Sequence, residues 1–165
     1  MALIKRSELL VFLNTTPGEN VETWGLAGKK TTDSSWSYEA DETSETYVTD
    51  DVATNTVNSY ALTMDDEMKC NSGDAVFEFV NDIRYYLKTN DEAVTDVLLI
   101  DKYDAVEEGK FRAQQFKCSI VISNYGGPGG QTATLTYAIK CSGNPKFGTV
   151  TMSNGVPTFT EAASA

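Results

Sequence analysis

The side chains most able to do chemistry are the carboxylates of Asp65-Asp66-Glu67, which fall in a segment of alternating polarity. A pair of carboxylates can supply the acid and the base of a hydrolytic reaction. Because adjacent residues of a strand point to opposite faces, only Asp65 and Glu67 share one. The 165 residues contain no histidine, the commonest general base and metal ligand, so no serine or threonine has an activating partner of that kind. The sequence therefore predicts a protein that is not an enzyme and has no catalytic residues.

Two other segments could bind ligands in principle. The glycine-rich run Gly126–Gly130 lacks the Lys-Ser/Thr of a phosphate loop and joins two expected strands, which indicates a hairpin tip. A group of acidic residues lacks the spacing and the central glycine of an EF-hand loop, which indicates a solvated turn; it consists of Asp101, Asp104, Glu107 and Glu108. We expect no cofactor and no metal.

Three cysteines, Cys70, Cys118 and Cys141, have no metal-binding spacing and cannot all pair with one another. Each falls in or beside an expected strand, where a free cysteine behaves as a small hydrophobic residue. Buried, reduced thiols are expected, as in a protein made in the cytosol.

The net charge is −11, from 24 acidic and 13 basic residues. Such a surface repels phosphate backbones, which argues against sequence-specific nucleic-acid binding, although repulsion is useful where nucleic acid must slide past without sticking. Positive charge is densest at Lys5-Arg6 and at Lys29-Lys30. These pairs are either solvated turns or one half of a head-to-tail contact between copies.

One segment, residues 74–88, predicts an α-helix. Asp74 can accept a hydrogen bond from an amide of the first turn, and the dipole favours the late basic residues. Val76, Val80, Ile83 and Leu87 form an apolar stripe at helical spacing. The helix must therefore lie on an apolar surface.

The rest of the chain predicts about nine strands. Ser59–Lys69 alternates cleanly, with Asp66 interrupting the apolar face at an expected bulge. Phe111–Tyr125 and Gln131–Cys141 each have one apolar face and one face of small hydroxylated residues, and Val97–Ile100 has the composition of a buried strand. This pattern predicts one mainly β domain over residues 1–165, a β-sandwich or barrel with one flanking α-helix.

The stretch from Thr31 to Asn58 is polar, and we expect a long loop over residues 31–58 that is either mobile or covered by a partner. No stretch approaches the roughly 20 apolar residues of a membrane span, so no insertion of this chain into a membrane is expected.

The order of these features resembles the major tail tube proteins of long-tailed, non-contractile bacteriophages, the siphovirus kind. The resemblance covers nearly the whole chain and rests on collinear motifs: Ile4-Lys5-Arg6-Ser7-Glu8, Trp24-Gly25-Leu26-Ala27-Gly28-Lys29-Lys30-Thr31-Thr32-Asp33, Glu42–Val48 with Asp50-Asp51, Val57-Asn58-Ser59-Tyr60, and Gly73–Arg84. Ala75 departs from the family, which often has proline there, and Gly126–Gly130 has no fixed counterpart.

The resemblance implies a β-sandwich or barrel whose copies join edge to edge into hexameric rings, which stack into a tube for genome delivery. It implies a location in the virion tail after assembly in the host bacterial cytoplasm. Expected partners are the chain itself and the tail tip or initiator, tape-measure and terminator proteins. DNA would pass through an acidic lumen without specific binding. Arms at residues 1–8 and 159–165 would contact adjacent rings.

Under this hypothesis two sets of residues are candidates. The residues expected to face the lumen are Asp65, Glu67, Ser119, Ser123, Thr134 and Thr136. The residues expected at contacts between subunits are Lys5, Arg6, Lys29, Lys30, Trp36, Tyr38, Tyr47, Asp50 and Asp51.

The alternative is a monomeric β-sandwich binding module of the adhesin or carbohydrate-binding type. Trp24, Trp36, Tyr38 and Tyr47 would then form an exposed aromatic platform. Light scattering separates the two hypotheses, because the module stays monomeric.

Overall fold

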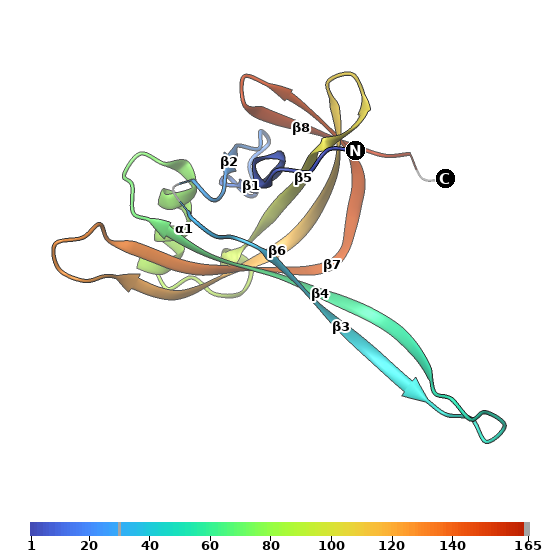
Figure 1. Ribbon diagram of the computed structural model, residues 1–165. Coiled ribbons are helices and arrows are strands. Elements are labelled where there is room, and N and C mark those ends of the chain that lie inside the picture. Colours follow the sequence, from blue (N-terminus) through green and yellow to red (C-terminus); the bar gives the residue numbers. More distant parts are fainter. Residues whose placement is uncertain (30, 164–165) are drawn as a thin grey trace.

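A computed structural model of the chain describes residues 1–29 and 31–163. Within them, eight strands form one antiparallel sheet, and one α-helix packs against it (Figure 1). The elements are, in order, a 3-10 turn η1 (Arg6–Glu8), β1 (Leu9–Asn14), β2 (Trp24–Leu26), β3 (Trp36–Glu45), β4 (Thr54–Lys69), α1 (Ala75–Tyr85), a 3-10 turn η2 (Asn90–Ala93), β5 (Val94–Glu107), β6 (Lys110–Gly126), β7 (Thr134–Ser153) and β8 (Val156–Glu161). The predicted mainly β fold with one flanking helix is confirmed.

The strands follow the order β2-β1-β5-β6-β7-β4-β3, and β8 pairs with β7. The 20 residues of β7 carry two partners on the side away from β6, first β4 and then β8. β7 includes the segment from Phe147 to Met152, which alternation alone predicted as a separate strand. The long strand β7 thus pairs with β4 at its beginning and with β8 at its end.

The sheet is rolled so that strands β1 and β5 are covered on both faces. Val11 and Val97 belong to a first core cluster beneath α1, whereas their neighbours Phe12 and Leu98 belong to a second cluster against β7 and β8. Strands buried on both faces have continuous apolar sequences, and the prediction of a buried strand at Val97–Ile100 is confirmed.

Helix α1 begins as its sequence predicts. The side chain of Asp74 accepts a hydrogen bond from the Phe77 N–H at 3.1 Å, a cap that stabilises a helix by about 1 kcal/mol. Val76, Val80 and Ile83 are buried in the first core. The apolar stripe therefore fixes the side on which the helix lies.

The predicted end of the helix at residue 88 is wrong. The Leu87 N–H bonds to the Arg84 carbonyl at 3.3 Å, and the Lys88 N–H bonds to the Ile83 carbonyl at 3.0 Å. This pattern is a Schellman motif, whose central position usually holds glycine because φ is positive there. Here Leu87 has φ of 50° and is 81% exposed, so it is not part of the apolar stripe.

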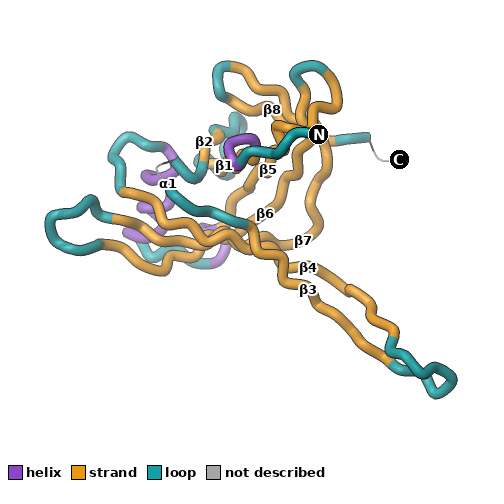
Figure 2. The backbone as a smooth tube through the Cα atoms, in the orientation of Figure 1, coloured by secondary structure: helices purple, strands orange, loops and turns teal. Residues whose placement is uncertain are grey.

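The predicted loop over residues 31–58 is also wrong. Most of this segment forms an antiparallel hairpin of β3 and β4, which projects far beyond the rest of the sheet (Figure 2). Its outer pairs run from Asp41 opposite Ser59 to Glu45 opposite Thr54. Every residue from Ser37 to Ala61 is exposed, so no apolar alternation marks the strands. Backbone pairing and the strand preference of Thr, Tyr and Val hold them together.

The two predicted arms are only partly free. Residues 1–5 have no regular structure, but Arg6–Glu8 form the turn η1. Phe159 lies in β8 opposite Val150 and packs against the second core, so the segment predicted as an arm over 159–165 begins as a strand. Residues 164–165 lie outside the described part of the chain.

Gly25 provides a test of how closely β2 approaches α1. A Cβ atom there would lie 2.6 Å from the Cγ2 of Val76, a buried residue that cannot turn away. We expect Gly25→Ala to lower the free energy of unfolding by about 1–3 kcal/mol in urea titrations. Gly129→Ala is the matched control, because an added Cβ there meets nothing within 4 Å. Equal stability of the two variants would contradict the close approach.

Candidate assembly surfaces

Strands β3, β4, β7 and β6 form a four-stranded unit with one polar face. In β4 the buried residues Leu62, Met64 and Met68 alternate with exposed Asp65 and Glu67. The register places Glu67 opposite Thr136 and Asp65 opposite Ala138 in β7. These side chains therefore leave the sheet on the face opposite to the first core and α1.

Three further lumen candidates fall on this same polar face. Thr136 lies opposite Glu67, Thr134 opposite Lys69, and Ser119 opposite Lys140. Ser123 falls at a register irregularity, where the pairing passes from Ile122 to Asn124, and Asn124 takes the position opposite Thr136. The strands thus bring together five of the six residues that sequence periodicity assigned to a common surface.

The polar face is not uniformly acidic. Lys69 of β4 and Lys140 of β7 lie on the same face as the two carboxylates, and Lys117 of β6 pairs with Ser142. Because the registers of distant strands decide which charges meet, net charge alone could not predict this mixture.

The two end strands of the unit have an unpaired edge, and within the hairpin Thr54–Leu62 of β4 also pairs only with β3. Within the described residues β3 pairs only with β4, and the part of β6 beyond Ser119 pairs only with β7. Ile120–Gly126 and Trp36–Glu45 therefore present rows of backbone N–H and C=O groups at the two ends of the four-stranded unit.

The basic residues predicted at subunit contacts make contacts within the chain. The Arg6 guanidinium donates to the carbonyl oxygens of Ser34, at 3.0 and 3.3 Å, and of Leu9, at 2.6 Å. The backbone N–H of Lys5 donates to the Glu8 side chain at 2.9 Å. The two bonds from Arg6 to Ser34 fasten the start of the chain to the segment that leads into β3.

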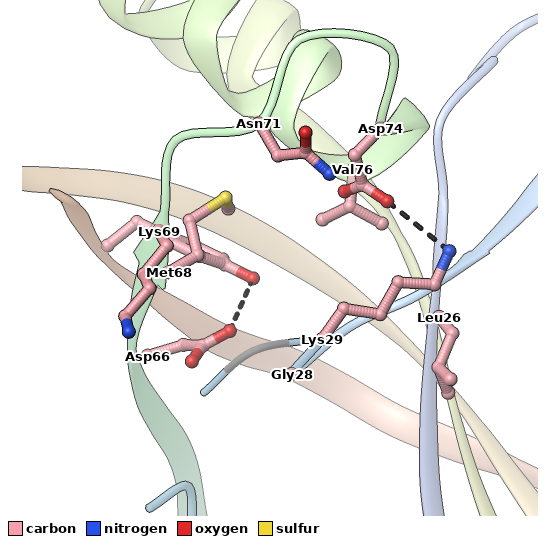
Figure 3. A pocket seen from close by; sticks show the side chains of 10 residues that line it. Leu26, Gly28, Lys29, Asp66, Met68, Lys69, Asn71, Asp74 and Val76 are labelled. Carbon is pink, nitrogen blue, oxygen red and sulfur yellow. Dashed lines mark hydrogen bonds and ion pairs between the residues drawn. The ribbon is translucent and has the colours of Figure 1, made fainter. Parts of the chain in front are cut away.

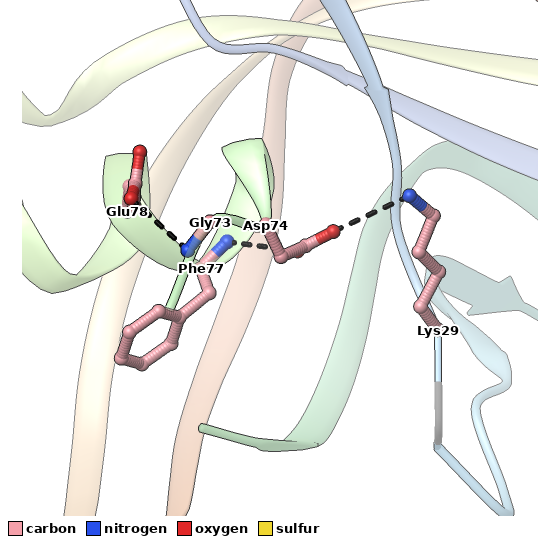
Figure 4. Close-up of polar contacts among 5 residues, drawn as sticks. All are labelled: Lys29, Gly73, Asp74, Phe77 and Glu78. Atoms are coloured by element: carbon pink, nitrogen blue, oxygen red, sulfur yellow. Dashed lines mark hydrogen bonds and ion pairs between the residues drawn. The ribbon is translucent and has the colours of Figure 1, made fainter. Parts of the chain in front are cut away.

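Lys29 joins the chain after β2 to the start of α1 (Figure 4). Its Nζ lies 3.3 Å from Asp74 Oδ1, while the other oxygen of Asp74 caps the helix, and the Gly73 N–H donates to Glu78 at 3.1 Å. The Lys29 side chain is mostly exposed, so the ion pair contributes at most about 1 kcal/mol. Lys30 lies outside the described residues.

The remaining contact candidates follow the hairpin outward. Trp36 packs against the first core, and Tyr38 is an exposed neighbour of Tyr60, with ring centroids 6.5 Å apart in an edge-to-face arrangement. Tyr47 is exposed near the tip, where its hydroxyl donates to Glu45 at 2.9 Å. Asp50 and Asp51 are exposed at the tip itself.

An aromatic platform of the kind expected for a binding module is not formed. Trp24 packs against the second core and Trp36 against the first, while Tyr47 lies near the hairpin tip. Because these rings belong to different parts of the molecule, they do not make one surface.

Sequence reasoning missed a buried polar pair in the first core. Asp66 is 1% exposed, and its Oδ2 accepts a hydrogen bond from the Tyr137 hydroxyl at 2.9 Å. The expected bulge at Asp66 is absent, because β4 and β7 pair in continuous register from Thr63 to Lys69. Burial, together with the adjacent Asp66, raises the pKa of Tyr137 well above its ordinary value and keeps the hydroxyl a donor.

The pair lines a cavity of about 50 Å³ between β4 and the start of α1 (Figure 3). Asp66 lies on one side of it, and Asp74 with Lys29 lies on the other. Asp66 Oδ1 has no hydrogen-bond partner among the described residues. The sequence could have indicated this pair only through the position of Asp66 opposite Tyr137 in the sheet. That position depends on the register of β4 with β7, which alternation does not reveal.

The cysteines are free thiols. Cys118 is buried opposite Cys141 in the β6–β7 pairing, and Cys70 is half-buried. Burial raises the pKa of Cys141 to about 12 and that of Cys118 further, so both remain protonated thiols without nucleophilic character.

The described residues contain no group of three or more His, Cys, Asp or Glu side chains that could hold a metal ion. None of their helices combines the length and the apolar character needed to cross a membrane.

Comparison with known proteins identifies the fold. No protein-family model and no curated protein matches the chain. A chain in the tail of an empty gene transfer agent particle, determined by helical refinement with C6 symmetry, is similar with a TM-score of 0.56 and 14% identity, over 88% of this chain and 98% of that one. A chain in the virion of a native gene transfer agent particle gives a TM-score of 0.57 with the same identity and coverage. The chain shares the fold of these particle proteins.

Removal of the Tyr137 hydroxyl tests the buried pair. We expect Tyr137→Phe to lower the free energy of unfolding by about 1–3 kcal/mol, because the Asp66 carboxyl group loses its partner while still buried. The double variant Asp66→Leu/Tyr137→Phe is expected to lose less, since no buried polar group is then left unpaired. Chemical denaturation measures both, and a double variant less stable than the single one would refute this role.

Proposed function

We propose that the chain is a structural subunit that self-associates into the tube of a siphovirus-type phage tail, a conduit for genome delivery built from stacked hexameric rings. The observation that carries the proposal is the pair of unpaired strand edges at opposite ends of one four-stranded unit. The fold shared with gene transfer agent particle chains supports it, and the tail structure among them has C6 symmetry.

The ring would form by pairing of these edges. A free strand edge is a template for another strand, and a closed barrel removes all edges. The β3 edge before the projecting part of the hairpin, Trp36–Ala40, and the β6 edge of the next copy provide five and seven residues for pairing. Six copies joined in this way would form a wall in which the four-stranded units make one continuous sheet.

The polar face would line the lumen, with Asp65, Glu67, Ser119, Thr134 and Thr136 toward the DNA. Hydroxyl groups and carboxylates offer phosphate no positive charge, and Lys69 and Lys140 lie among them rather than in a continuous basic stripe. A face of this kind suits passage without specific binding. Helix α1, which lies on the opposite face, would then be on the outside of the wall.

The hairpin of β3 and β4 would join adjacent rings. Its outer part from Asp41 to Ser59 makes no contribution to either core, so its length serves contacts outside the monomer. Tyr47, Asp50 and Asp51 at its end would meet the neighbouring ring. The tip or initiator, tape-measure and terminator proteins would be partners at the tube ends and lumen, and the tube would be part of the virion.

Shortening the hairpin tests the proposal. Residues Glu42–Asn58 are replaced by Asn-Gly, a two-residue turn that matches the pairing of Asp41 with Ser59. We expect the free energy of unfolding to change by less than about 1 kcal/mol, because no core residue is lost. Negative-stain images of concentrated protein should show tubes for the wild type and none for the variant. Tubes of normal length from the shortened chain would contradict the role of the hairpin.

A further inference from the structure

The end of α1 has an apolar protrusion that nothing in the monomer covers. Tyr85, Tyr86 and Leu87 are consecutive and are 67%, 66% and 81% exposed. Leu87 also occupies the positive-φ position of the Schellman motif, where glycine would be free of strain. A residue kept in a strained, exposed place is a sign of function outside the fold itself.

An apolar hollow lies beside β3. Its volume is about 280 Å³, and it lies between β1, β3 and β5. Leu9, Leu10, Leu99 and Trp36 contribute to its wall, and the exposed Ser35 lies at it. The buried atoms Trp36 Nε1 and Ser34 Oγ have no hydrogen-bond partner among the described residues. The wall of the hollow therefore contains two polar atoms without partners in the monomer.

The protrusion has basic neighbours, and the surroundings of the hollow are mixed but mainly acidic along β3. Arg84 and Lys88 flank the protrusion, and neither forms an ion pair within the described chain. The hollow itself is lined by Asp101 and by Arg6, whose guanidinium donates to the carbonyls of Ser34 and Leu9. Glu39 and Asp41 follow on the edge strand, and these carboxylates favour contact with the basic residues of another copy.

We propose that the Tyr86-Leu87 end of α1 in one copy docks in the hollow beside β3 of the next copy. The inference rests on the proposed function, because the protrusion adjoins the free part of β6 and the hollow adjoins β3, the two strands that would pair in the ring. Ser119–Ile122 of β6 and Leu87 line one groove, so a strand added to β6 brings its own hollow to the protrusion. The contact is heterologous, the kind that closes rings.

Leu87→Gly tests the inference without a folding penalty. Glycine suits the positive φ, so the melting temperature of the monomer should be unchanged or higher. Loss of the docked side chain should raise the protein concentration needed for half-assembly by roughly tenfold or more in sedimentation velocity. Asn154→Gly is the matched control, because Asn154 also has a positive φ, of 50°, lies in the turn between β7 and β8, and should assemble like the wild type.

Mixing of two variants identifies the hollow as the docking place. Ser35→Trp should fill the hollow and prevent assembly, while its own protrusion remains intact. Mixed with Leu87→Gly, whose hollow is intact, it should form heterodimers of twice the 18.0 kDa monomer mass that grow no further.

Three outcomes would contradict these inferences in different ways. A wild-type chain that stays monomeric overturns the proposed function together with the docking. Wild-type assembly with equal assembly by Leu87→Gly and Asn154→Gly overturns only the docking. Absence of heterodimers from two variants that are each monomeric overturns the assignment of the hollow.

Discussion

The proposed function of this protein depends on the unpaired backbone groups along two strand edges. The groups lie on Trp36–Glu45 of β3 and on Ile120–Gly126 of β6, at opposite ends of a unit whose inner strands are β4 and β7. Backbone donors and acceptors must be satisfied by water or by another strand, and exposed edges of this length are templates for association. Because the edges lie at opposite ends, the proposed pairing between copies would continue the sheet in one direction until it closed.

The rest of the fold holds these edges in place. The rolled sheet buries β1 and β5 on both faces, and α1 closes the first core through Val76, Val80 and Ile83. The exposed Leu87 follows this helix. In the proposed assembly the buried stripe of the helix would serve the stability of the monomer, and the residues at its end would serve association.

Local features of the fold were predictable from sequence, and features that depend on distant pairing were not. The cap at Asp74 and the alternation around Asp65 and Glu67 obey local rules and are confirmed. The sequence did not predict the hairpin, because strands exposed on both faces have no apolar period. It did not predict the end of the helix, because Leu87 occupies the position where glycine usually marks the end. The Asp66–Tyr137 pair and the mixed charge of the polar face depend on the register of β4 with β7, which periodicity does not specify.

Hydrogen exchange of backbone amides in monomer and assembled protein tests most directly whether the edges pair. Both edge segments should exchange rapidly in the monomer, and assembly should slow exchange at about every second amide, because alternate residues of an edge strand direct their N–H groups outward. The inner strand β7, already paired on both sides over Thr134–Lys140, should change little. Equal exchange of the β3 and β6 edges in monomer and assembly would contradict edge pairing and, with it, the proposed wall.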